Sequence, residues 1–376
     1  MKRRTVLTRL AAAAGAAVAM PALAQFDRRI VLGQSAAFSG AAAQLGIQMN
    51  RGAKLCFDAV NAAGGIHGAQ IELRTLDDMY EPDKCKANTE ALIKDEVFAL
   101  FGYVGTPTSL AALPLVNQHK VPFFGPFTGA EALRDPFSRY VFHVRASYYD
   151  ETALIVKQLT QLNLKKIAIF RQNDSYGQAG YDGVVRALKA LNLEPVAVGL
   201  VERNTVAVES AVQAIVPKQP DAVVQISAYK SCAAFIREAR KAGYGGTFYN
   251  VSFVGTQALA DELGRQAMGV VVSQVMPFPF SQTTPISREY LAAVQKVGGD
   301  NKPNYSSMEG YVAAKVFTEG LKRAGKAPTR DALINALEAI QSLDLGGFVV
   351  GYGAKGHVAS RFVDLSMLTD DGRVRV

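Results

Sequence analysis

Two series of short apolar runs, each run followed by a longer segment of helical periodicity, constrain the fold of this chain most. The runs are rich in Val, Ile and Leu and are apolar on both faces, which is typical of parallel strands covered by helices on two sides. The first series predicts strands at 28–35, 69–77, 97–101 and 121–124, and helices at 44–63, 82–94 and 107–119.

The pattern then restarts and predicts a second lobe similar to the first. Its expected strands are 165–170, 194–200, 222–226, 247–251 and 269–275, and its expected helices are 151–162, 177–191, 206–216 and 231–242. The last hundred residues instead predict three helices, 286–297, 307–324 and 329–340, and two strand-like segments, 347–350 and 361–368. Three helices cannot complete a third core, so we expect them on the first lobe and the final strands on the second. The fold class is therefore α/β, with two Rossmann-like lobes built on parallel central sheets, as expected for about 350 residues.

Residues 1–24 are typical of an export signal. They contain four basic residues and no acidic one, then the apolar run 10–20, then an A-x-A site that ends at Ala24. The run is too short to span about 30 Å of hydrocarbon. Arg3-Arg4 favours the twin-arginine route, with general secretion as the alternative. We expect cleavage after Ala24 and a periplasmic location.

Charge and cysteine content exclude some classes of protein. Without the signal, 37 basic and 33 acidic residues remain, a formal charge of +4. No cluster of five or more Lys or Arg occurs, so nucleic acid is not an expected partner. An exported protein could form a Cys56–Cys85 bridge, but we expect these cysteines and Cys232 to be buried free thiols.

Motifs for enzymatic chemistry fail on their context. Residues 351–356 fit G-x-G-x-x-G, but the mechanism needs a following helix and a strand-like segment follows instead. Residues 320–327 resemble a P-loop, but Ala327 lacks the hydroxyl that binds Mg²⁺, and a helix C-cap explains the glycine. The four histidines are far apart in sequence and no zinc spacing occurs. We expect no enzyme, no metal and no cofactor.

Polar loops follow the ends of two first-lobe strands, where open α/β sheets bind ligands. In residues 101–109 Thr106 is placed to cap a helix with Pro107 in its first turn, and the free N–H groups of Thr108 and Ser109 predict a neutral anion cradle. In residues 125–131 the spacing from Thr128 to Glu131 predicts a capping box.

The second lobe places polar and aromatic residues at equivalent strand ends. These loops are 173–177, 227–229 and 250–253. Tyr176 and Tyr229 are each unremarkable as surface aromatics, but because they share one sheet edge we expect them to face a flat or apolar ligand body.

Several segments together are similar to the leucine/isoleucine/valine-binding family of periplasmic proteins. They include Asn61-Ala62-Ala63-Gly64-Gly65-Ile66, Asp77-Asp78 followed by Pro82, and Tyr176-Gly177. The resemblance covers essentially the mature chain and implies the type I periplasmic-binding-protein fold, with a hinge of three crossovers. It divides the chain into a first lobe, 26–146 with 276–346, and a second lobe, 147–275 with 347–376.

The resemblance also implies a ligand site. By position Thr106, Thr128 and Gly129 resemble the family's contacts to the ligand carboxylate and ammonium, and Tyr176 and Tyr229 its second-lobe contacts. The predicted ligand-binding residues are Tyr103, Thr106, Phe127, Thr128, Gly129, Tyr148, Asp150, Tyr176, Tyr229 and Ser252.

One departure from the family bears on the ligand. Ser252 stands where amino-acid binders carry a glutamate that pairs with the ammonium. An ammonium buried without a partner costs about 2–5 kcal/mol. A neutral edge therefore favours an aromatic or aliphatic acid without an amine over a branched-chain amino acid, unless Asp150 or Asp174 substitutes.

The sequence therefore predicts a binding protein that closes its lobes on a small carboxylate and delivers it to the permease and ATPase subunits of an ABC importer. A sensor of the same fold that signals to a partner protein is the alternative.

Overall fold

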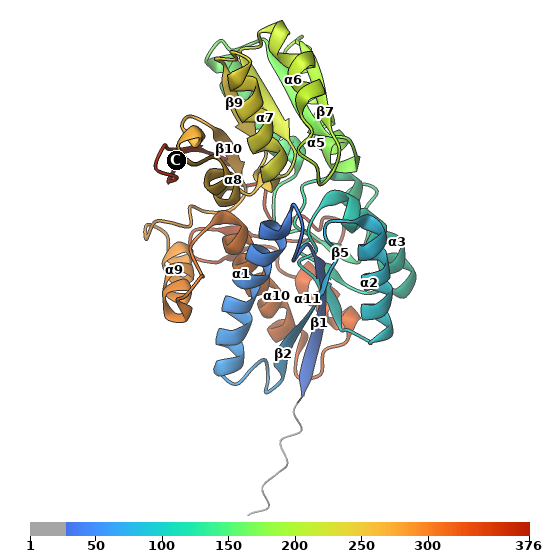
Figure 1. Cartoon of the computed structure of the whole chain (residues 1–376). Helices are drawn as coiled ribbons and strands as arrows, with labels where there is room; N and C mark the ends of the chain where they lie inside the picture. Colours follow the sequence, from blue (N-terminus) through green and yellow to red (C-terminus); the bar gives the residue numbers. More distant parts are fainter. Residues whose placement is uncertain (1–27) are drawn as a thin grey trace, which may run out of the picture.

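The computed structural model describes residues 28–376, which form two α/β lobes (Figure 1). The predicted export signal lies outside the described residues. Within residues 28–376, no helix combines the length and apolarity that crossing a membrane requires.

The first lobe is built on a five-stranded parallel sheet in the order β2-β1-β3-β4-β5. Its strands are β1 (Arg29–Ala36), β2 (Gln70–Asp77), β3 (Ala99–Phe101), β4 (Phe123–Phe124) and β5 (Val141–Phe142). Its helices are α1 (Ala43–Ala62), α2 (Pro82–Lys94), α3 (Thr106–His119), α9 (Pro285–Val297), α10 (Tyr305–Ala324) and α11 (Arg330–Glu338). Of the three late helices, α9 and α10 pack against α1, and α11 packs against α10.

Helices α1 and α10 pack unusually closely because glycines line their contact. A Cβ atom on Gly52 would lie 1.8 Å from the carbonyl oxygen of Ser307, and one on Gly310 would lie 2.1 Å from that of Met49. Only residues without a side chain allow the two backbones to approach so far. This contact fixes α10 on the first lobe.

The second lobe has a seven-stranded sheet in the order β14-β13-β10-β9-β8-β6-β7. Five of its strands run parallel: β6 (Ile167–Gln172), β7 (Ala197–Val201), β8 (Ala222–Ile226), β9 (Thr247–Asn250) and β10 (Val271–Gln274). The antiparallel strands β13 (Asp364–Leu368) and β14 (Val374–Arg375) extend one edge. Its helices are α4 (Tyr148–Gln161), α5 (Ser175–Lys189), α6 (Glu209–Ile215), α7 (Tyr229–Lys241) and α8 (Thr256–Leu263).

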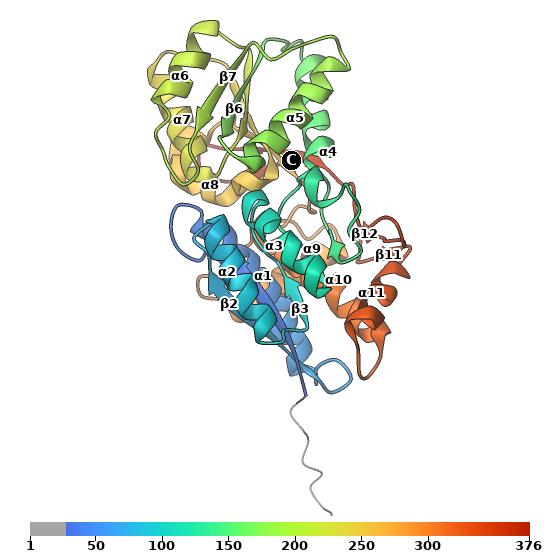
Figure 2. The same cartoon turned by 90° about the vertical axis from the view of Figure 1, so that its right-hand side faces the viewer.

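The chain crosses between the lobes three times. It leaves the first sheet after β5, leaves the second after β10, and returns to the second before β13. Across the boundary α3 packs against α5 (Figure 2). Helix α10 also contacts α8. The three crossings lie close together, since Arg361 of the third pairs with Asp150 at the end of the first, and Gln274 at the start of the second donates to Ser366 of β13. Strands β2 and β7 are the edge strands farthest from β5 in the first sheet and from β13 and β14 in the second.

The third crossing falls later than the sequence suggests. The hairpin of β11 (Leu343–Asp344) and β12 (Val349–Val350) leads into a Gly-rich turn in which Gly353 and Gly356 form a bridge. After β12, His357 stacks on Phe142 of β5 at 3.8 Å between ring centroids, and the Ala359 N–H donates to the carbonyl of His143. The chain therefore changes lobe between Ala359 and Asp364, not at residue 347. Its irregular backbone carries no periodicity from which the sequence could have shown this.

Two further sequence predictions are confirmed. Cys56, Cys85 and Cys232 are free and buried, and burial raises the pKa of the Cys56 thiol to about 12. Helix α10 ends at Ala324 with Gly325 at a φ of 91°, so the P-loop-like segment is a helix C-cap.

Candidate ligand site between the lobes

Aromatic side chains from both lobes meet where the carboxyl ends of the two sheets face each other. The ring of Phe253 lies 5.7 Å from Phe127 and 5.8 Å from Tyr80 of the first lobe, and 4.6 Å from Tyr176 of its own lobe. Tyr176 in turn lies 5.5 Å from Tyr148. The predicted residues Phe127, Tyr148 and Tyr176 therefore share one interface.

The two threonines of the first-lobe loops are brought together, as expected. The hydroxyl oxygens of Thr106 and Thr128 lie 2.6 Å apart, and both side chains are fully buried. The Thr128 hydroxyl also donates to the Tyr148 hydroxyl at 3.4 Å and accepts from the Ala130 N–H at 3.2 Å. Three hydroxyl groups thus lie in series at the boundary between the lobes.

The caps expected of these threonines are absent. Gly105, at a φ of 102°, is the N-cap of α3, so Thr106 is already the first helical residue, and the Ser109 N–H is bound to the Gly105 carbonyl. After β4 a short 3₁₀ turn begins only at Glu131, with no side-chain cap. The prediction failed because a glycine in a left-handed conformation can begin a helix without a side-chain acceptor. Because α3 begins without a cap from Thr106, the Thr106 hydroxyl faces Thr128 instead.

Gly129 allows the first lobe to approach the start of α4. A Cβ atom there would lie 2.7 Å from the Tyr148 nitrogen and 2.6 Å from its Cδ1 atom, while the Tyr148 N–H donates to the Gly129 carbonyl at 2.7 Å. Gly129 therefore positions Tyr148 beside Thr128.

Tyr103 does not share this interface. Its ring packs 5.0 Å from that of Phe123, and its hydroxyl lies 3.1 Å from the Thr89 hydroxyl of α2, within a separate apolar cluster of the first lobe. The tyrosine lies beyond the end of β3, where the sequence does not reveal to which side a side chain turns.

The two aspartates that could have replaced the missing glutamate are both used as helix caps. Asp150 forms a capping box with Ser147 at the start of α4. Asp174 caps α5 by accepting from the N–H groups of Tyr176 and Gly177. Neither is left free for a ligand ammonium.

A buried arginine with two glutamates lies beside the aromatic interface and was missed from the sequence. Arg145 is fully buried, and its guanidinium lies 5.2 Å from the ring of Phe127 and 5.8 Å from that of Tyr148. It forms ion pairs with Glu151 at 2.9 Å and with Glu309 at 3.5 Å. We call Arg145, Glu151 and Glu309 the hinge cluster, because Arg145 directly precedes the first crossing. Arg145 and Glu309 are 164 positions apart in sequence, so no local pattern could have paired them.

The two glutamates of the hinge cluster are unequally satisfied. Glu151 accepts from Arg145, from both the N–H and the hydroxyl of Ser252, and from the Ser273 hydroxyl. Among residues 28–376, the polar contact found for the Glu309 carboxylate is the 3.5 Å ion pair with Arg145. Burial raises the pKa of the Glu309 carboxyl to about 7, although Arg145 opposes the shift.

Ser252 lies at the boundary between the lobes, but an acid stands directly behind it. Its hydroxyl accepts from Arg145 and its N–H donates to Glu151 at 2.8 Å. Beside it is a cavity of about 10 Å³, with Phe127, Tyr305 and Glu309 among its lining residues. That volume holds one water molecule at most, so the lobes must part to admit anything larger.

Several buried polar atoms at the strand ends have no hydrogen-bond partner among the described residues. They are Ser109 Oγ, Gln172 Oε1, the Tyr176 hydroxyl and Ser227 Oγ. Tyr229 reaches the other lobe, where its hydroxyl accepts from the Gln44 N–H at 3.5 Å. Because unpaired buried polar atoms are costly, these groups are candidates for contacts to a ligand.

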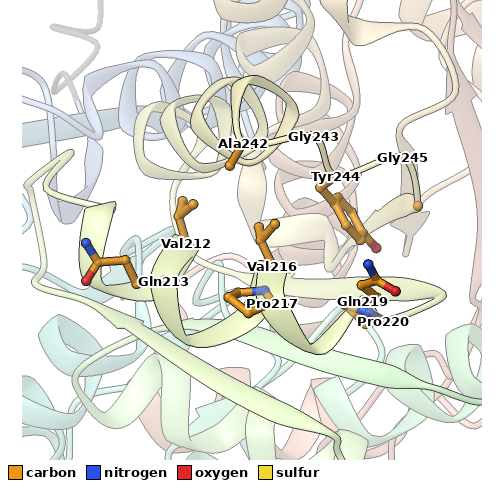
Figure 3. A pocket seen from close by; sticks show the side chains of 11 residues that line it. Val212, Gln213, Val216, Pro217, Gln219, Pro220, Ala242, Gly243, Tyr244 and Gly245 are labelled. Atoms are coloured by element: carbon orange, nitrogen blue, oxygen red, sulfur yellow. The ribbon is translucent and has the colours of Figure 1, made fainter.

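A larger hollow lies away from this interface. It has a volume of about 550 Å³ and is formed by the end of α6, the turn after it and residues 242–246 (Figure 3). These segments precede β8 and β9, so the hollow lies at the opposite end of the strands from Ser227 and Ser252. Among its lining residues Tyr244 alone carries a titratable group. Within residues 28–376, no cluster of three or more His, Cys, Asp or Glu is suited to hold a metal ion.

Comparisons with known proteins agree with this architecture. The family model described as periplasmic binding protein matches residues 29–373. The Leu/Ile/Val-binding protein homolog 8 of Brucella suis is 26% identical, over 97% of this chain and 94% of that protein.

Solved structures extend the likeness. The structure of a possible leucine/isoleucine/valine-binding protein from Rhodopirellula baltica is 35% identical, with a TM-score of 0.89 over 93% of this chain and 96% of that chain. A fatty acid ABC transporter substrate-binding protein from Thermomonospora curvata is 22% identical, with a TM-score of 0.84 over 93% of this chain and 91% of that one, and so shows the fold alone.

Proposed function

Because the chain belongs to the periplasmic binding protein family, of the Leu/Ile/Val-binding type, we propose that it captures a small carboxylate between its lobes for an ABC importer. The permease and ATPase subunits of that importer would receive the ligand. The observation that carries this proposal is the pair of buried hydroxyls of Thr106 and Thr128 beside Tyr148, at the junction of the two lobes.

A carboxylate suits these groups chemically. Hydroxyls donate to an anion without bringing a charge that must be desolvated. Thr106 is the first residue of α3, a helix of 14 residues, and the positive end of the helix dipole favours an anion at that place. The unpaired Tyr176 hydroxyl supplies a further donor from the second lobe.

The surrounding acids favour a ligand without an amine. Asp150 and Asp174 cap helices, and Glu151 already accepts four hydrogen bonds. Glu309 remains for a ligand ammonium, and its raised pKa makes its charge incomplete at neutral pH. An aromatic or aliphatic acid needs no such partner. Proteins of this fold include both a possible leucine/isoleucine/valine-binding protein and a fatty acid ABC transporter substrate-binding protein.

Closure of the lobes is the proposed binding mechanism. Phe127 and Tyr80 of the first lobe contact Phe253 of the second, and the cavity beside Ser252 is the size of one water. A ligand that contacts both lobes shifts the population toward the closed state, which an importer can recognise. We place this cycle in the periplasm, with the chain cleaved after Ala24.

The test uses acids matched in pairs. Mature protein, unfolded and refolded to remove carried-over ligand, is screened by thermal shift with L-leucine against 4-methylpentanoate and L-phenylalanine against 3-phenylpropanoate. A ligand at 100 times its Kd adds about 2.7 kcal/mol and is readily detected. We expect the amine-free member of a pair to raise the Tm more. A larger shift with the amino acid would overturn the preference, and no shift with any carboxylate would contradict the proposed function.

A matched pair of threonine variants tests the site itself. T128V keeps the side-chain shape but removes a donor to the ligand, so its affinity should fall about 10- to 100-fold. T318V is the control, because Thr318 is also buried and its hydroxyl donates to the Ala314 carbonyl within α10. Equal affinities of T128V and the wild type would remove Thr128 from the site.

A further inference from the structure

A second set of polar contacts joins the lobes, far from the crossings. It links the loop after β2, residues 78–81, with the loop after β7, residues 202–205. Because β2 and β7 are edge strands on the side opposite the crossings, these loops have the longest lever arm about a hinge. Contacts there are the first to break when the lobes part.

Arg203 and Asn204 hold both oxygens of one carboxylate across this gap. Arg203 Nη2 donates to Glu81 Oε2 at 3.0 Å, and Asn204 Nδ2 donates to Glu81 Oε1 at 2.8 Å. Asn204 Nδ2 also lies 3.1 Å from the Met79 carbonyl oxygen. Deeper inside, Gln172 Nε2 donates to the Tyr80 hydroxyl at 3.3 Å.

Contacts and backbone conformation within each of the two loops already position the residues that meet across the gap. Within the second lobe Asp174 binds the other Arg203 nitrogen at 3.2 Å and so fixes the guanidinium. Met79 and Tyr80 in one loop and Asn204 in the other have positive φ values of 54°, 61° and 61°. Such backbone is costly for residues other than glycine and is retained where surrounding contacts require it.

We propose that Arg203, Asn204 and Glu81 form a latch that holds the lobes closed and so positions them on the ligand. This rests on the proposed closure of the lobes. The latch touches none of the residues assigned to the ligand, so it acts on the closed population and not on ligand selectivity. Because the side chains of Arg203 and Glu81 are 24% and 39% exposed, salt should weaken it.

Distances between the lobes test the latch without a ligand. Spin labels at K86C and S210C, both exposed and flanking the two loops, report the separation by double electron–electron resonance. We expect R203A, E81A and 500 mM NaCl each to move the distribution toward longer distances, and R203A/E81A to move it no further than E81A, which already removes the contacts of Glu81 with both Arg203 and Asn204. R139A is the control, because Arg139 pairs with Asp331 at 2.9 Å within the first lobe.

Binding gives the second readout. With the four acids of the matched screen as probes, R203A should weaken whichever are bound by about 5- to 20-fold, through faster dissociation. The ratio between the paired acids should stay that of the wild type. Unchanged distances and unchanged affinities in both R203A and E81A would overturn the latch. If no acid binds the wild type, the proposed function fails. The distances between the two spin labels then test on their own whether the latch holds the lobes closed.

Discussion

The hinge cluster and the latch use the same chemistry in opposite surroundings. In each, one arginine lies between two carboxylates and pairs across the lobe boundary. Arg145 pairs with Glu151 and Glu309, and Arg203 pairs with Glu81 of the latch and, within its own lobe, with Asp174. The first arginine side chain is fully buried and the second is 24% exposed. Buried charges left unpaired are costly, whereas exposed ones are solvated when they separate. The comparison teaches that the buried hinge cluster stays paired whether the lobes are open or closed, and so belongs to the permanent framework. The exposed latch can break and re-form as the lobes open and close.

The largest expected effect is that of removing the buried arginine. R145M leaves Glu151 and Glu309 without their cation and should lower the free energy of unfolding by about 3–5 kcal/mol. Urea unfolding at pH 7.5 measures this loss. If R145M lowers the free energy of unfolding no more than R203A does, the difference in burial does not distinguish the hinge cluster from the latch.

A smaller effect is expected from the under-satisfied glutamate. The ordinary pKa of a glutamate carboxyl is 4.5, and burial raises that of Glu309 to about 7. Between these values the folded protein keeps a proton that the unfolded chain has lost, so its stability falls as the pH rises from about 4.5 to about 7 and is level above.

E309Q removes this pH dependence. The stability of the variant relative to the wild type should rise by about 1–3 kcal/mol between pH 4.5 and pH 7.5. Urea unfolding at several pH values measures the difference. Burial also raises the pKa of Asp78 to about 6, but this residue is present in both proteins, so its contribution to the pH dependence cancels in the difference. A difference that stays constant with pH would show that Glu309 does not titrate in this range.

The smallest effect on stability is expected at the latch. R203A should lower the free energy of unfolding by less than about 1 kcal/mol, because its carboxylate partners become hydrated when the lobes part. R139A removes an exposed ion pair within one lobe and should lower the free energy of unfolding, measured with urea, by a similarly small amount. A loss of several kcal/mol in R203A alone would assign Arg203 to the framework.

Much of the architecture was predictable because parallel strands and their helices leave a periodic signal. Most elements from β1 to β10 and the convergence of Thr106 with Thr128 follow from apolar runs and strand ends, but the two-residue strand β5 and helix α8 were not predicted. The position of residues 351–359 on the first lobe did not, since that segment has neither helical nor strand periodicity.

The site was less predictable because it depends on the direction in which each side chain turns and on contacts between residues far apart in sequence. Tyr103 turns away from the interface although Thr106, three residues on, faces it. Arg145 and Glu309 look like ordinary charged residues until the fold brings them together. Ser252 suggested a neutral edge, but Glu151, 101 positions earlier, lies directly behind it.

Small-angle scattering of the refolded mature protein tests the central claim most directly. The radius of gyration is measured with and without the carboxylate that raises the Tm most. Closure of the lobes on this acid predicts a smaller radius in its presence for the wild type and, at a concentration that just saturates the wild type, a smaller change for T128V. A carboxylate that stabilises the protein without any change in radius would contradict closure and direct attention to the hollow near Tyr244, which a ligand could fill while the lobes stay as they are.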